Sequence, residues 1–254
     1  MLYTDGNPSR IEDLRVFESS IHEVASVEGI DLDAKLDVAA AEIGDQLMGY
    51  LLQPASGDPQ AGARRTLGLS TLVVTPAMRR WHALHTLALT FRDAFHNQIN
   101  GRYQENWRHY VSASAEARSV LFRIGLGFVM NPMPRPRGVV VTEGSGTWAA
   151  GSYQVQAAWV NAQGRVSAPS ELTVIALSNT GGFSVRMPVA PVGVTGWHVY
   201  VGESGGDLYQ QNATKLALGS VWTSAASAVL VGEMPGSGQF ADVYVAASRQ
   251  TPRG

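Results

Sequence analysis

Charged residues and glycines are distributed unevenly along this chain of 254 residues, and no other sequence feature restricts its fold as much. Residues 1–137 hold 29 of the 40 residues that are Asp, Glu, Lys or Arg, but only 10 of the 27 glycines. A charged, glycine-poor half followed by an uncharged half rich in Gly, Ser, Thr and Val predicts an α+β protein with two domains.

The boundary between the two halves lies in a proline-rich segment. Asn131–Arg137 carries proline at three alternate positions, which excludes a helix and favours an extended chain. We therefore expect a linker at 132–138 between a helical domain at 1–131 and a β domain at 139–248, followed by a short tail at 249–254.

Apolar residues in the first half recur at spacings of three and four, the period of an amphipathic helix. Thr75-Pro76 is a typical helix start, with threonine as the N-cap and proline at the first helical position. The pattern predicts a small helical bundle. Its long helices are expected at 31–53, 76–100 and 102–124, after a shorter helical stretch at 9–27.

Short runs rich in Val, Tyr, Trp and Thr fill the second half, separated by clusters of Gly, Pro, Asn and Ser. About seven strands of this kind predict an antiparallel β-sandwich, with Trp159 and Trp197 in its core. The expected strands lie at 139–142, 153–160, 172–176, 183–187, 197–201, 216–218, 229–231 and 243–246.

The composition excludes several kinds of site. The chain has no cysteine, which excludes disulfides, thiol catalysis and Cys-ligated zinc. Its net charge of −2 gives no basic bias for gripping nucleic acid or an anionic membrane surface. The N-terminal residues lack a signal-peptide pattern and no stretch is typical of a membrane span, so we expect a soluble protein made in the cytoplasm, without a cofactor.

Two patterns resemble catalytic or metal sites, but each has a simpler interpretation. Gly202–Gly206 has the G-x-S-x-G form around Ser204, yet a nucleophile elbow requires a helix directly afterwards, and we expect a turn between strands. His82 and His85 lack the Glu-x-x-His pairs of a bundle metal site, so we interpret them as partly exposed helix histidines. We therefore predict no catalytic and no metal-binding residues.

Charge is also divided within the first half. Residues 1–58 carry 12 acids and three bases, whereas residues 59–137 carry 11 bases and three acids. Either neighbouring helices of one bundle pair with each other, or the acidic face of one copy meets the basic face of the next in a head-to-tail contact. The candidate subunit or portal interface consists of Glu12, Asp13, Glu18, Asp37, Glu42, Arg64, Arg65, Arg79, Arg80, Arg92 and Arg102.

Both halves resemble known families. The helical segments at 27–47, 81–95 and 102–107 resemble those of the head-to-tail adaptor (connector) proteins of tailed bacteriophages, and the resemblance covers about residues 10–130. The second half resembles a fibronectin type III or immunoglobulin-like module over about residues 145–240. The stretches that carry this second resemblance are Tyr153–Asn161, Ser167–Ser170 and Gly196–Gly202.

The resemblance implies a structural virion protein at the junction of capsid and tail. Adaptors of this family form a ring of about twelve copies under the portal protein and extend the DNA channel, so the expected partners are further copies, the portal and the next tail component, such as a stopper, terminator or nozzle. DNA would pass through without being bound specifically, and the family has no catalytic residues to carry over.

Two other functions remain open at this point. The β domain could be a host-surface or glycan-binding module on a tail or baseplate component, with Trp148, Tyr209 and Trp222 as exposed aromatic side chains for recognition. The third hypothesis is an enzyme that uses Ser204 as its nucleophile.

Overall fold

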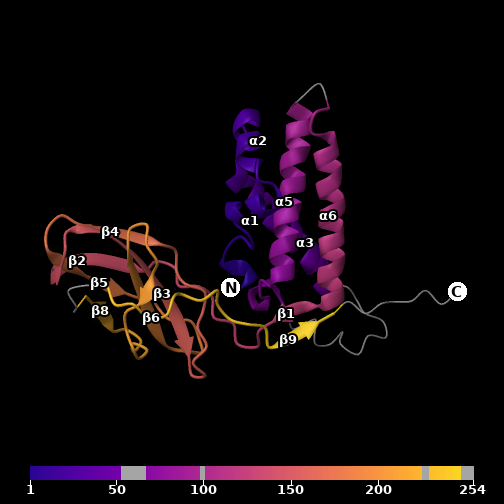
Figure 1. The fold of residues 1–254 in the computed structure, drawn as a ribbon. Helices are drawn as coiled ribbons and strands as arrows, with labels where there is room; N and C mark the ends of the chain where they lie inside the picture. The colour runs from indigo at the N-terminus through magenta and orange to yellow at the C-terminus, as the bar shows by residue number, and fades with distance from the viewer. Residues whose placement is uncertain (53–66, 98–100, 225–228, 247–254) are drawn as a thin grey trace. The chain divides into compact units, whose positions relative to one another are not determined.

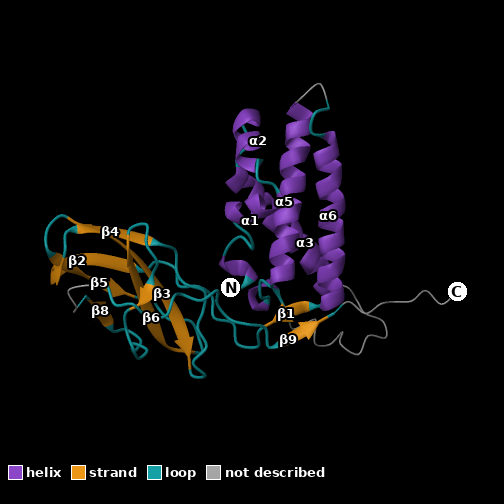
Figure 2. Cartoon of the chain, viewed as in Figure 1, coloured by secondary structure: helices purple, strands orange, loops and turns teal. Residues whose placement is uncertain are grey.

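A computed structural model describes residues 1–52, 67–97, 101–224 and 229–246 of the chain (Figure 1). The chain divides into two compact units. We call them the helical unit, which comprises residues 6–130 and the end of the chain from Ala241, and the sheet unit, which comprises residues 1–5 and 131–240. The α+β architecture expected from the sequence is confirmed (Figure 2).

The helical unit is built around one central helix. Helix α5 (Pro76–Asn97) buries 12 of its 22 residues and contacts α1, α2, α3 and α6, the other α-helices among the described residues. The N-cap expected at Thr75 is present, since its Oγ1 accepts a hydrogen bond from the Met78 backbone at 3.3 Å. The other helices are α1 (Ile11–Phe17), α2 (Ile21–Glu28), α3 (Leu32–Leu52) and α6 (Gln104–Ile124).

These bounds confirm the three long helices predicted from periodicity and correct the prediction at 9–27. That stretch forms two short helices rather than one, because α1 ends at Phe17 and α2 begins at Ile21. Helix α2 then ends at Gly29, which adopts the left-handed conformation with φ of 66° that glycine tolerates best.

A two-stranded antiparallel ribbon lies in the helical unit and joins distant parts of the chain. Strand β1 (Leu126–Phe128) pairs with β9 (Val243–Val245), and the backbone of Met130 donates to Asp242 Oδ2 at 2.9 Å just beyond the pair. The strand expected at 243–246 therefore forms, but it belongs to the helical unit and not to the sandwich. Residues 131–240 are an insertion between two paired strands of the helical unit.

The sheet unit contains two antiparallel sheets that share one aromatic core. One sheet has the order β2-β5-β8 and the other β4-β3-β6-β7. Trp159, Phe183 and Trp197 are buried in a common cluster with residues of both sheets, which confirms the sandwich. The bounds are β2 (Val140–Trp148), β3 (Gly151–Asn161), β4 (Thr173–Leu177), β5 (Gly181–Arg186), β6 (Val194–Glu203), β7 (Tyr209–Gln210) and β8 (Val221–Thr223).

Two of the expected strands do not form. In the segment 216–218 only Leu216 pairs, as a single bridge to Trp197, and the described residues 229–231 have no strand conformation. Instead of a ladder, the backbone of Leu230 donates to the side-chain oxygen of Gln211 at 3.0 Å. Apolar composition predicted these two strands, but among the described residues each segment makes only isolated hydrogen bonds to its neighbour and no continuous ladder. Just beyond the second segment, Gln210 N donates to Glu233 O at 2.8 Å as another isolated bond.

The proline-rich segment 132–138 is not a free linker. Met133 is buried in the core of the sheet unit, and its backbone donates to Gln239 Oε1 at 2.6 Å. The backbone of Arg135 donates to the buried carboxylate of Asp5 at 2.8 Å. Proline excludes helix here as expected, but the residues between the prolines retain N–H groups that bind the sheet unit, so the segment is part of that unit. The division at Met130/Asn131 lies next to the boundary expected at 131, whereas the sheet unit begins at Asn131 instead of 139 and ends at Phe240 instead of 248.

Candidate functional site

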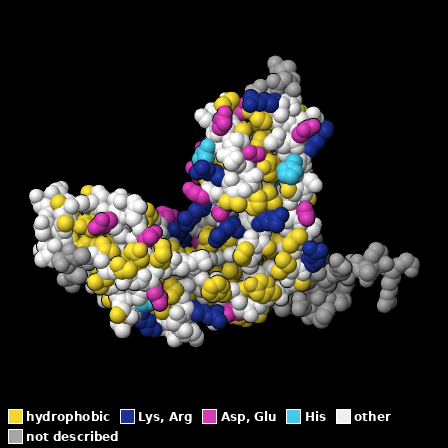
Figure 3. All heavy atoms as spheres, viewed as in Figure 1, with side chains coloured by type: hydrophobic (Ala, Val, Ile, Leu, Met, Phe, Trp, Pro, Cys, Tyr) yellow, Lys and Arg dark blue, Asp and Glu magenta, His cyan; other side chains and the backbone are white. Residues whose placement is uncertain are grey.

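Charged side chains are concentrated on the helices. Figure 3 shows them over the helical elements, whereas the visible surface over the strands is mostly apolar or uncharged. Residues 6–52, which include α1 to α3, hold ten acids and three bases, and residues 67–130, which include α5 and α6, hold seven arginines and three acids. The exposed acids on or beside α1 to α3 are Glu12, Glu23, Asp31, Asp33, Asp37 and Asp45; the exposed arginines on or beside α5 and α6 are Arg79, Arg80, Arg102, Arg108, Arg118 and Arg123.

Ion pairs between the described helices do not account for Arg79 and Arg80. Lys35 of α3 binds Asp93 of α5, which is the reverse of the expected polarity, and His85 Nε2 lies 2.7 Å from Glu42 Oε2. Within the described part of the chain, Arg79 and Arg80 make no ion pair. The positive charge at the start of α5 is therefore left for solvent or for another molecule.

The predicted interface residues fall into three groups. Glu12, Asp37, Arg79, Arg80 and Arg102 are exposed. A second group is partly buried and bonded within the helical unit: Asp13 caps α1, Glu18 accepts from Tyr110 at 3.1 Å, Glu42 binds His85, and Arg92 lies 3.4 Å from its neighbour Asp93. The third group, Arg64 and Arg65, lies outside the described residues.

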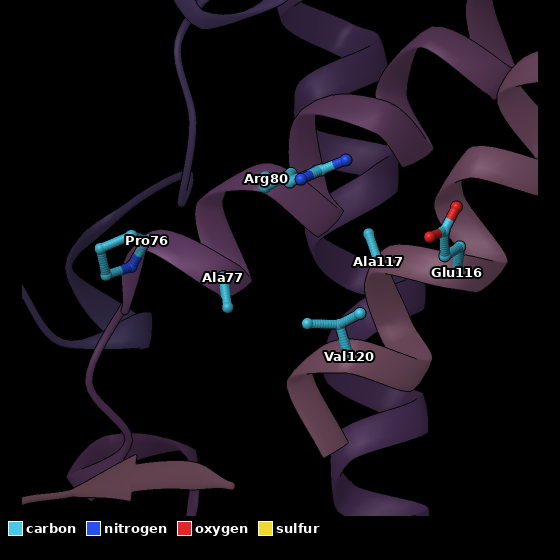
Figure 4. Close-up of a pocket in the computed structure, with 6 residues that line it drawn as sticks. All are labelled: Pro76, Ala77, Arg80, Glu116, Ala117 and Val120. Atoms are coloured by element: carbon cyan, nitrogen blue, oxygen red, sulfur yellow. The ribbon is translucent and has the colours of Figure 1, made fainter. Parts of the chain in front are cut away.

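An apolar groove lies between the start of α5 and the second half of α6, beside the two unpaired arginines (Figure 4). Its volume is about 270 Å³. Ala77 and Ala117 leave this space because neither has a side chain long enough to fill it, and Val120 points from α6 toward α5. Sequence periodicity missed the groove, because the packing of Ala77 opposite Ala117 and the lack of ion pairs within the described residues at the nearby arginines are visible only in the tertiary structure. It is lined by Pro76, Ala77, Arg80, Glu116, Ala117 and Val120.

His82 corrects the prediction of partly exposed helix histidines. Its side chain is fully buried, with Nδ1 2.7 Å from Ser9 Oγ and Nε2 3.1 Å from the carbonyl oxygen of Leu36. Nε2 must donate to that carbonyl oxygen. Burial lowers the pKa of His82 to about 4, so the ring is neutral near pH 7 and Nδ1 accepts the Ser9 hydroxyl proton. Because Ser9 is also buried, this pair has no route to a substrate and acts as a structural contact.

A second Ser–His contact joins α5 to α6. Ser114 Oγ is 3.4 Å from His85 Nδ1, and Glu42 binds the other ring nitrogen. Ser114 projects from the middle of α6, where the backbone N–H groups that an oxyanion hole would need are used within the helix. No group of three His, Asp or Glu side chains arranged to hold a metal ion occurs among the described residues.

The three aromatic side chains predicted to be exposed for recognition in the sheet unit are all at least partly buried. Trp148 is 1% exposed and packs edge-to-face against Tyr153 and Phe183 at centroid distances of 5.0 and 5.2 Å. Trp222 is partly buried against the same core. Tyr209, on the short edge strand β7, has the same intermediate exposure as Trp222. Trp148 is the last residue of β2 and its side chain points into the core. Apolar and polar residues do not alternate regularly along β2, so the sequence does not show which face of the strand is buried.

The G-x-S-x-G segment forms the strand-to-strand turn predicted for it. Strand β6 leads through Ser204 into β7, and these two strands pair antiparallel. The backbone of Ser204 donates to Ser152 O at 2.9 Å, and a Cβ at Gly202 would lie 2.2 Å from Asp207 O, so glycine is needed there for the chain to fold back. The helix that follows a nucleophile elbow is replaced by a strand.

Comparison with known proteins adds no assignment: no protein-family profile matches this chain, and no curated protein matches it in sequence. Among the helices of the described residues, none has both the length and the apolar character needed to cross a membrane.

Proposed function

We propose that this chain is a structural virion protein that forms a ring between the capsid portal and the tail and extends the DNA channel. The observation that carries the proposal is the separation of exposed charge in the helical unit, with acids on α1 to α3 and arginines on α5 and α6 that include the unpaired Arg79 and Arg80. Two unlike surfaces on one molecule favour a heterologous contact, which closes into a ring when the rotation permits.

The identity of the ring's neighbours comes from the resemblance of the helical segments to phage head-to-tail adaptors. In that setting the portal is the template, and the next tail component binds the opposite side of the ring. A net charge of −2 suits a channel wall, because each Lys or Arg contact to phosphate would add salt-dependent affinity and slow the passage of DNA. Many weak contacts around a ring also combine into a stable assembly.

The experiment that tests this function mixes the full chain with the portal ring of its own particle. Electron microscopy and light scattering should show an added ring on the portal, with about twelve copies of the chain. Sedimentation of the chain alone is the control, since an adaptor can remain monomeric until the portal templates it. A chain that stays monomeric both alone and with the portal would refute the proposal.

The glycan-binding alternative is weakened by the burial of Trp148. It now depends on Trp222 and Tyr209, and single half-buried aromatic side chains are common on protein surfaces.

A further inference from the structure

We infer that the groove between α5 and α6 receives the exposed face of α3 from a second copy of this chain. The inference deepens the proposed function and rests on it, because it assigns the two surfaces through which neighbouring copies of a ring would meet. It starts from the groove, where small side chains leave an apolar hollow at the surface of an otherwise packed helix pair.

The surroundings of the groove are mainly positive. Arg80 lines it, Arg79 precedes Arg80 on the same exposed turn, and Arg123 follows Val120 by three residues and so projects from the same side of α6. Glu116 is the one acid among the lining residues. An occupant should therefore present a small apolar side chain surrounded by acids.

The exposed face of α3 has this chemistry. Ala34, Val38, Ala41 and Asp45 follow each other at spacings of three and four, so they share one face, and Val38 is 42% exposed. Asp33 and Asp37 lie beside them and are exposed as well. The opposite face of the same helix is already used inside the helical unit, where it buries Leu36, Ala39, Ile43 and Leu47.

Charge complementarity selects the second copy as occupant. In the described part of the chain, Asp45 makes no ion pair, and Asp37 accepts only a hydrogen bond from Asn7 at 2.7 Å. The arginines at the groove are likewise unpaired, so each surface lacks what the other offers. Val38 would fill the groove, while Asp37 and Asp45 would meet Arg79 and Arg80 at its rim. Rim charges of this kind mainly set register and partner choice.

The test uses two charge-reversed variants of the full chain, Arg79→Glu with Arg80→Glu, and Asp37→Lys with Asp45→Lys. Sedimentation at low salt and ring assembly on the portal are measured for each variant alone and for an equal mixture. Each variant alone should associate at least about tenfold more weakly than wild type, because like charges then face each other. The mixture should recover association. The groove of the arginine variant, now acidic, can pair with the α3 face of the aspartate variant, now basic, and the two unaltered surfaces can pair as in wild type.

A matched control is Arg15→Glu with Arg186→Glu, which makes the same change in net charge as the arginine variant at exposed sites outside α5 and α6, one on α1 and one in the sheet unit. It should associate as wild type does, and circular dichroism should show that all variants are folded. Recovery in the mixture is a result that a general loss of folding or solubility cannot produce.

The outcomes separate the interface from the function. If wild-type rings form on the portal and the two variants form them equally well, the interface is wrong and the proposed function stands. If wild type associates through these two faces but does not bind the portal, the interface stands and the proposed function is wrong. If wild type neither associates nor binds the portal, both are wrong.

Discussion

The helical unit and the sheet unit use their polar side chains in opposite ways. In the sheet unit, Asn212, Ser167 and Ser224 turn inward and bind backbone groups that the ladders leave unpaired, as when Val199 N donates to Asn212 Oδ1 at 2.9 Å. In the helical unit the backbone bonds are made within helices, so charged side chains can extend outward.

This difference indicates where recognition can occur. The sheet unit packs around an aromatic core and carries little charge, so its surface offers few charged groups for specific contacts. The helical unit keeps unpaired arginines at a groove and unpaired acids on α3, which are the groups that can distinguish one partner from another. The two surfaces of the proposed assembly contact therefore both lie in the helical unit.

The strongest test of this separation removes one large core side chain from each unit. Trp197→Ala should destabilise the sheet unit by about 3–5 kcal/mol, because the indole is fully buried and leaves a cavity. Urea unfolding followed by near-UV circular dichroism should show the sheet transition at lower denaturant, with the helical transition unchanged.

The matched variant is Trp81→Ala, in the core of the helical unit, where the ring is 1% exposed. It should shift the helical transition and leave the sheet transition in place. A single transition that moves in both variants would show that the two units unfold together and are not stabilised independently.

A second test uses the insertion of the sheet unit between β1 and β9. Replacing residues 131–240 by a short turn should leave a folded helical unit, because Phe128 and Val243 are already paired and Met130 is bonded to Asp242. The change in loop-closure entropy is about 3 kcal/mol at most. Far-UV circular dichroism and thermal melting measure the outcome.

The control for this deletion is Gly127→Ala in the shortened chain. A Cβ at Gly127 would lie 2.8 Å from Ala241 Cβ, so the variant should melt at lower temperature if the ribbon has formed. An unchanged melting temperature would mean that β1 and β9 no longer pair.

The smallest of the three effects concerns pH and the buried His82. The unfolded chain binds a proton at this residue below pH 6.5, whereas the folded chain stays neutral down to its lowered pKa of about 4. Stability of the helical unit is therefore lost as the pH falls through this window, by about 2 kcal/mol between pH 7 and pH 5. Urea unfolding at the two pH values measures it.

His82→Gln is the control, since glutamine keeps a side-chain donor and acceptor but does not titrate in this range. The variant should lose most of the pH dependence of the helical transition. His198 of the sheet unit, whose pKa burial also lowers, should still contribute in the same direction to the sheet transition. An equal pH dependence in wild type and His82→Gln would contradict the role of the buried ring.

Much of the fold was predictable because local periodicity and turn chemistry act over a few residues. The starts and ends of α3, α5 and α6 follow from apolar spacing and from Thr75-Pro76, and Trp159 and Trp197 were correctly placed in the sheet core. The failures at Trp148 and His82 have a shared cause: which face of an element is buried depends on neighbours that are distant in the sequence.

The amino-acid sequence by itself determined the two kinds of secondary structure and the division of charge, because composition and period are properties of short segments. Only the tertiary structure decided that the sheet unit is an insertion, that the prolines belong to it, and that an apolar groove lies beside unpaired arginines. Each of these depends on contacts between segments that are far apart in the sequence. Phe128 and Val243, for example, pair across more than a hundred residues, and no local pattern specifies such a contact.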